Sequence, residues 1–215
     1  MAKDGQMWLE LLGTTEQFEK LVLDSINKQF SKAVEKSILS IQEGVKVLVY
    51  DGIYNCNEME SLRGDSLRSE LGLTPAQGER ASENIADAVS ESVIAEQQKT
   101  GLVLYIQPAS FQNVLSISGS SISYLSKTYK QNVTLEWLDW LINRGDEIIV
   151  GNFSFDPSGK GRAGSGRMKK GGSWRVSPRY AGTESDNFIT RALQNDSLQE
   201  EMAVVIEKTI KKNWK

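Results

Sequence analysis

Histidine is absent from this chain of 215 residues, and cysteine occurs once, at Cys56. Without histidine, neither a Ser–His–Asp triad nor a Cys–His nucleophile pair can form. A single cysteine excludes an internal disulfide framework and removes the usual ligands of structural zinc. We therefore expect a protein that is not an enzyme, that holds no cofactor or metal, and that folds in reducing surroundings.

Long hydrophobic runs are also absent, since no stretch approaches the ~20 apolar residues needed to cross a bilayer. The opening MAKDGQMWLELLG has an apolar part that is too short and too interrupted for a signal peptide. No proline-rich linker and no internal repeat divide the chain. The sequence therefore predicts one domain over residues 1–215, with no secretory export and no membrane partner.

Acidic residues are missing from one segment. The net charge is −3, yet residues 157–183 carry seven Lys or Arg and no Asp or Glu, so the other 18 basic and 28 acidic residues sum to −10. A basic segment on an acidic body is expected to attract phosphate groups or an acidic partner surface, including a second copy of the chain.

A long N-terminal helix is predicted between Thr14 and Gly44, because apolar residues recur every four positions from Phe18 to Ile38. Gly44 is expected to end it. The β-rich run Val45 to Tyr50 then predicts a short strand.

Two helical segments are predicted next. Residues 57–73 indicate short helical turns broken at Gly64 and ended at Gly72. Thr74-Pro75-Ala76-Gln77 has the pattern of a capping box with proline at the first helical position, so a helix is expected from there to about Gln98.

The second half of the sequence mixes strands and helices. Strands are expected at 102–107, 114–118, 121–126, 147–150 and 153–155, and helices at 134–144 and, as a pair, within 185–212. The predicted fold is α+β: a small mixed or antiparallel sheet, packed by the long N-terminal helix and the C-terminal helices, with a long Gly/Lys/Arg-rich loop.

That loop is predicted over residues 157–172, PSGKGRAGSGRMKKGG, which include six glycines and no β-branched or aromatic residue. We expect it to be flexible and to contact a partner protein or nucleic-acid phosphates without reading base sequence. The candidate contact residues in and beside it are Lys160, Arg162, Arg167, Lys169, Lys170 and Arg175.

Three other sequence features give little support for a functional site. Gly159 to Gly164 spells G-x-G-x-x-G, but no helix-forming sequence follows it and the next acidic residue is Glu184, so dinucleotide binding is not predicted. Cys56 has no activating neighbour, which favours a small buried side chain over a nucleophile. Trp137 and Trp140 lie three apart on one helix face, which is typical of a core or an interface.

Longer motifs carry a resemblance to a known family. They include the Trp-Leu-x-Trp-Leu helix at 137–141, the segment Trp174-Arg175-Val176-x-Pro178, Ala181-Gly182-Thr183 and Asn187-Phe188-Ile189-Thr190-Arg191-Ala192. With residues 58–73, they resemble the neck or tail-completion proteins of tailed bacteriophages, particularly those with contractile tails. The residues taken as interface or anchor positions are Trp137, Trp140, Trp174, Asn187, Phe188 and Arg191.

The resemblance implies a structural virion protein, made in the host cytoplasm and located at the head–tail junction. It implies a ring of copies, commonly six, that joins the portal or adaptor connector to the tail terminator or tail tube and closes the DNA-filled head. A neck ring, a tail terminator and a head-completion protein remain open, as does non-specific contact with packaged DNA. The alternative from the residues alone is a nucleic-acid-binding module that uses the basic loop on phosphates.

Overall fold

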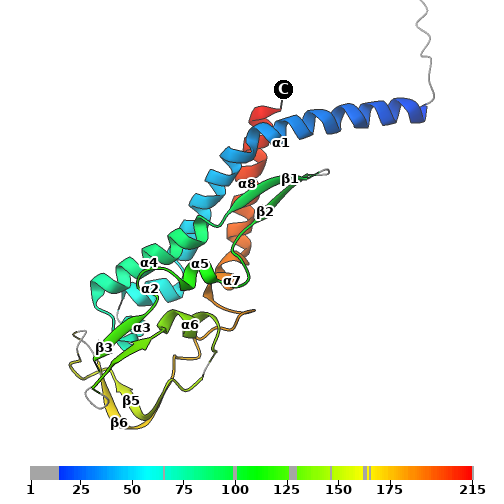
Figure 1. Ribbon diagram of the computed structural model, residues 1–215. Helices are drawn as coiled ribbons and strands as arrows, with labels where there is room; N and C mark the ends of the chain where they lie inside the picture. Colours follow the sequence, from blue (N-terminus) through cyan, green and yellow to red (C-terminus); the bar gives the residue numbers. More distant parts are fainter. Residues whose placement is uncertain are drawn as a thin grey trace, which may run out of the picture.

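The computed structural model describes residues 15–64, 66–98, 101–125, 130–145, 147–161, 164 and 166–214. These residues form an elongated single-domain α+β fold, which confirms the predicted class (Figure 1). The strands pair as three separate two-stranded antiparallel sheets, however, and do not make the one small sheet that we expected. None of the helices formed by these residues is long and apolar enough to cross a membrane.

Two antiparallel helices form the long axis of the molecule, α1 (Thr15–Tyr54) and α8 (Asp196–Asn213). Their contacts run in opposite directions along the two sequences: the rings of Phe30 and Trp214 lie 5.7 Å apart, and Asn213 Nδ2 donates to Ser37 Oγ at 2.9 Å. At Gly44 the helices approach so closely that a Cβ would lie 2.7 Å from Val205 Cγ1. The glycine therefore permits helix packing and does not end α1.

The predicted strand at Val45 to Tyr50 is wrong, because this run continues α1. Ile41, Val45, Val49 and Ile53 follow one another at intervals of four and are all fully buried. In a helix this spacing places the four side chains on one face, where they join the core shared with the neighbouring helices. Burial of this face outweighs the β-preference of the individual valines.

The helical turns after α1 form as predicted, with α2 (Asn57–Arg63) and α3 (Ser66–Leu71) separated at Gly64. Helix α4 (Pro75–Ser90) begins with the predicted capping box at Thr74 and Gln77. It ends earlier than expected, because residues 94–98 form strand β1 (Ile94–Gln98), which pairs with β2 (Gly101–Tyr105). This hairpin lies along α1, where Gln97 Nε2 donates to the carbonyl of Ser31.

The predicted strand at 114–118 is also wrong: Gln112–Leu115 is a single helical turn, α5, with Val114 buried beneath it. Asn113 fixes this turn by donating from Nδ2 to the carbonyl of Ala88. Strands β3 (Ile122–Leu125) and β4 (Asn132–Leu135) make a second hairpin, and α6 (Trp137–Ile142) follows directly.

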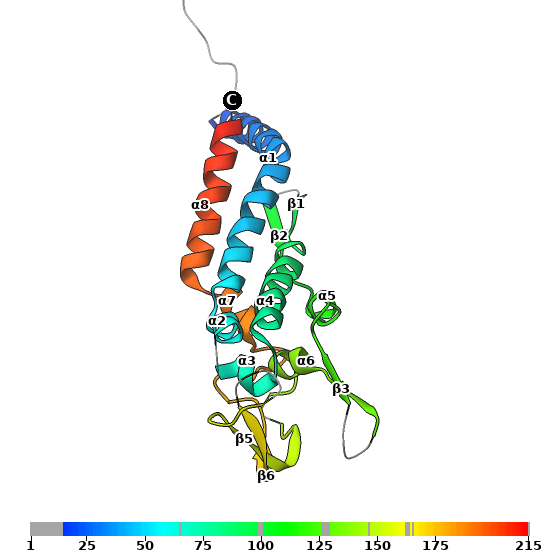
Figure 2. The ribbon, with the colours of Figure 1, turned by 90° about the vertical axis from the view of Figure 1, so that its left-hand side faces the viewer.

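The third hairpin consists of β5 (Val150–Asp156) and β6 (Arg167–Trp174), with a register shift between Gly151 and Phe153. The chain then returns through α7 (Phe188–Leu193) to α8. Figure 2 shows this third hairpin at the end of the molecule opposite the N-terminal turns of α1.

Candidate interaction surfaces

Strand β6 includes the last six residues of the predicted basic loop. Residues 167–172 are not a loop, because they pair with β5: Arg167 lies opposite Asp156, Lys169 opposite Ser154 and Lys170 opposite Phe153. Cross-strand pairing supplies the backbone hydrogen bonds that order this segment despite its glycine content. Hereafter β5 and β6 together are called the basic ribbon.

Asp156 organises one side of the basic ribbon. Its Oδ2 lies 2.7 Å from Lys169 Nζ and 3.6 Å from Arg167 Nε, and its Oδ1 accepts from the Ser158 hydroxyl at 2.6 Å. The Lys169 hydrogen bond, followed by that of Ser158, holds the pKa of Asp156 well below its ordinary value. Two of the predicted contact residues are thus already paired within the chain.

The other predicted basic contacts are spread apart. Lys160 and Lys170 are exposed, and neither makes an ion pair with another of the residues described above. Arg175 lies just beyond β6 and is exposed. Arg162 falls outside the described residues. Lys170 of the ribbon and Lys160, between its two strands in sequence, are therefore exposed cations for which the described residues supply no ion-pair partner.

Most of the predicted anchor residues lie inside the protein and hold its parts together. Trp137 is fully buried and donates from Nε1 to the carbonyl of Gly119 at 2.8 Å, while Phe188 is 1% exposed. Trp140 packs edge-on against Trp174, with ring centroids 5.9 Å apart. This contact fixes the base of the basic ribbon to α6.

Asn187 and Arg191 anchor the segment around α7. The Asn187 side chain accepts hydrogen bonds from the N–H groups of Ile189 and Thr190 and donates to the carbonyl of Thr183. Such a cap satisfies amides that a helix leaves unpaired. Arg191 donates to both Glu58 and Asp186 at 2.8 Å, so it connects α7 to α2.

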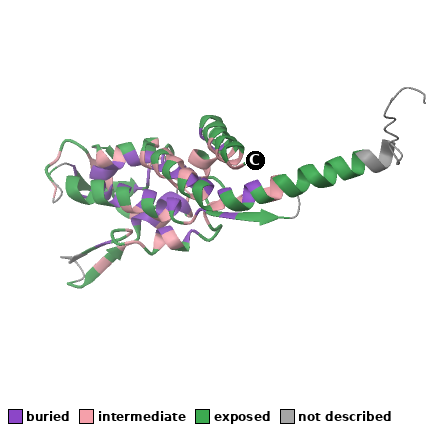
Figure 3. Ribbon diagram, turned by 90° about the horizontal axis from the view of Figure 1, so that it is seen from above, coloured by how far each residue is buried: buried purple, intermediate pink, exposed green. Residues whose placement is uncertain are grey.

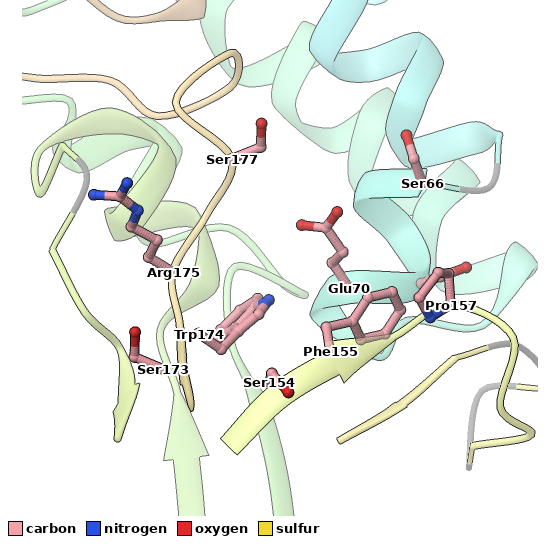
Figure 4. Close-up of a pocket in the computed structure, with 10 residues that line it drawn as sticks. Ser66, Glu70, Ser154, Phe155, Pro157, Ser173, Trp174, Arg175 and Ser177 are labelled. Atoms are coloured by element: carbon pink, nitrogen blue, oxygen red, sulfur yellow. The ribbon is translucent and has the colours of Figure 1, made fainter. Parts of the chain in front are cut away.

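A pocket of about 780 Å³ lies between α3 and the base of the basic ribbon. Figure 4 shows Glu70 of α3 opposite Trp174, with Phe155 and Ser154 of β5 along the adjoining wall. Sequence reasoning missed Glu70, because a single glutamate in an amphipathic turn carries no signal that it will face a distant tryptophan. The segment 58–73, the motif containing Trp174 and the candidate contact Arg175 pointed to this region without singling out Glu70.

The N-terminal half of α1 forms a second uncovered surface. Residues 19–29 are all exposed, and their large apolar side chains include Leu21 (66% exposed), Leu23 (58%), Val22 (54%) and Ile26 (45%). Figure 3 shows these turns projecting beyond the body of the molecule. We call residues 19–29 the helical arm; it ends just before Phe30, whose ring packs against Trp214 at the C-terminal end of α8.

Among the described residues, no group of three or more Cys, Asp or Glu side chains is placed to hold a metal ion. Comparisons with protein-family models, with curated proteins and with solved structures find no match to this chain. The arguments about function therefore start from the two uncovered surfaces, the basic ribbon and the helical arm.

Proposed function

We propose that this protein is a structural subunit of the neck of a tailed bacteriophage, which forms a ring between the head connector and the tail. The observation that supports this best is the position of the two uncovered surfaces at opposite ends of an elongated body (Figures 1 and 2). A subunit that joins two parts of a particle needs one contact surface toward each. Its place is at the head–tail junction of the virion.

The helical arm supports an assembly role because its large apolar side chains are exposed among the described residues. Four large apolar groups exposed within six residues are costly in water, and isolated helical turns are only marginally stable. Exposed apolar surface of this kind is typical of protein–protein contact. In the proposed ring, the arm packs on a neighbouring subunit.

The test is mass photometry with negative-stain microscopy of the purified protein. Six copies of 23.9 kDa give closed rings of about 143 kDa. Val22→Ser with Ile26→Ser should abolish rings without changing the unfolding temperature, because these side chains are exposed. Asn27→Ser, an exposed polar change on the same arm, is the matched control and should leave rings intact.

A second function, binding to nucleic acid through the basic ribbon, is favoured by the uncommitted Lys160 and Lys170. Duplex DNA titrated at several salt concentrations separates the two. A phosphate-binding module loses affinity steeply as the salt concentration rises. The logarithm of its binding constant falls with the logarithm of the salt concentration, with a slope of about −0.9 per phosphate contact. Particles that remain at 23.9 kDa at every concentration and show this slope would favour the nucleic-acid module over the ring.

A further inference from the structure

The pocket between α3 and the basic ribbon contains a buried donor with nothing to donate to. Trp174 is 7% exposed, and its Nε1–H has no hydrogen-bond partner among the described residues. Figure 4 shows the indole nitrogen on the edge of the ring that faces Glu70. Buried polar groups without a partner are rare, because each loses its hydrogen bond to water without replacement. No acceptor among the described residues lies within hydrogen-bond distance of this nitrogen.

Glu70, on the opposite wall, is a half-buried carboxylate without a cation. No hydrogen bond or ion pair connects it to another described residue, and burial raises its pKa above the ordinary value. Arg175 extends away from it in Figure 4. A molecule that covers Glu70 removes its remaining water, and a positive group beside the carboxylate offsets that cost.

The basic ribbon of the same chain offers both missing groups. Lys170 is exposed and has no anionic partner among the described residues, whereas Lys169 is held by Asp156. Among the described residues the ribbon has two strands, so each strand has an outer edge with main-chain carbonyls that no third described strand uses. A lysine and an edge carbonyl complement an unpaired carboxylate and an unpaired indole N–H.

A ribbon cannot supply these groups to its own pocket. Ser173 and Trp174, at the base of β6, form part of the pocket wall, and Lys170 lies only four residues before Trp174 on the same strand. A strand rises about 3.3 Å per residue and cannot fold back over so short a distance while it remains paired with β5. A ribbon that fills this pocket therefore comes from another molecule.

We propose that the pocket between α3 and the basic ribbon receives the basic ribbon of a second copy, with Lys170 of that copy paired with Glu70 and an edge carbonyl accepting from Trp174 Nε1. Each copy then has one pocket and one ribbon, which gives a head-to-tail contact that closes into a ring when the rotation permits. The inference deepens the proposed function, because it names the contact between neighbouring subunits of the ring.

The first test uses the native chain and a synthetic amidated peptide of residues 166–172, GRMKKGG. The probe is the ¹⁵N indole resonance of Trp174, assigned with Trp174→Phe. Saturable displacement of this resonance is expected, with affinity at least about tenfold weaker for Glu70→Gln protein or for a peptide with both lysines replaced by glutamine. Absence of displacement, or equal affinity in all three cases, overturns the proposal.

The second test is disulfide cross-linking between two full-length variants in a Cys56→Ala background. Glu70→Cys mixed with Lys170→Cys should give a covalent heterodimer. Glu70→Cys mixed with Lys36→Cys, an exposed residue on α1, should not. Equal cross-linking in both mixtures overturns the contact. If Glu70→Gln still forms rings and the mixture of Glu70→Cys with Lys170→Cys does not cross-link, this contact is overturned. The proposed ring is then unaffected. Cross-linked pairs without closed rings overturn the ring and leave the contact.

Discussion

Arg191 connects α7 to α2 across 133 residues of sequence, with its Nη2 donating to Glu58 Oε1 at 2.8 Å. The same guanidinium donates from Nη1 to Asp186, at the turn before α7. Only 9% of the Glu58 side chain is exposed, against 40% for Arg191. Water therefore reaches Glu58 less than Arg191, and the Glu58 carboxylate depends on Arg191 to compensate its charge.

Arg191→Met should destabilise the protein by about 2 kcal/mol, because it leaves Glu58 charged and nearly buried. The value lies below the 3–5 kcal/mol typical of a fully buried pair, since Arg191 is partly solvated. Chemical denaturation measures the effect, and adding Glu58→Gln should recover part of it. Lys211→Met, at the exposed pair with Glu207, is the control, and an equal loss there would contradict the assignment.

Gly44→Ala should destabilise the contact between α1 and α8, although alanine is the better helix former. The new Cβ would lie 2.7 Å from Val205 Cγ1, so α8 must shift or Val205 must leave its rotamer. A net loss of about 1–2 kcal/mol is expected, as for overpacking in general. A double-mutant cycle with Val205→Ala should recover most of it, and additive losses would show that the two positions are independent.

Asp156→Asn should loosen the basic ribbon at neutral pH, since it removes the anion that pairs with Lys169 and Arg167. The Lys169 hydrogen bond lowers the pKa of Asp156, so the stabilisation is present above the ordinary value of 3.8 and is lost as the pH falls below it. Hydrogen exchange across 150–174, corrected for the intrinsic rate, should be independent of pH from 5 to 7 in the native protein and faster in the variant. Exchange that already accelerates between pH 7 and 5 would contradict this.

Cys56 should resist labelling in the native protein. Burial raises the pKa of its thiol from 9.0 to about 11, so little thiolate exists at pH 8. Ellman's reagent should react slowly until denaturant is added. Because the unfolded thiol ionises first, stability should fall as the pH rises from 9 toward 11, and Cys56→Ala should remove that part of the decline. Rapid native labelling at pH 8 would refute the burial argument.

Local signals in the sequence correctly located several elements. The capping box at Thr74 and Gln77 begins α4 because its hydrogen bonds involve only neighbouring residues. Gly72 ends α3 with φ of +71°, a conformation that glycine adopts at little cost. The two C-terminal helices follow their own polar caps at Asn187 and Asn195. Interactions within a few residues can be predicted without knowing the fold.

The errors lie where distant residues decide the outcome. Val45 to Tyr50 reads as a strand, yet it is helical because its buried side chains join a core to which α4 and the C-terminal elements contribute. Residues 167–172 read as a loop, yet they form a strand because β5 lies beside them. In both cases the competing local preference is worth less than the tertiary contacts.

The candidate sites divide in the same way. The sequence by itself determined that the positive charge is concentrated in residues 157–183, that histidine is absent and that the N-terminal helix is amphipathic, since these are properties of composition and spacing. Only the tertiary structure decided that Asp156 neutralises part of that charge, that Glu70 faces Trp174, and that Trp214 packs on Phe30 while the helical arm is exposed. Each of these depends on which distant segments pack together. The free energy of burial depends on the surface that this packing removes from water, and the order of neighbouring residues alone does not specify it.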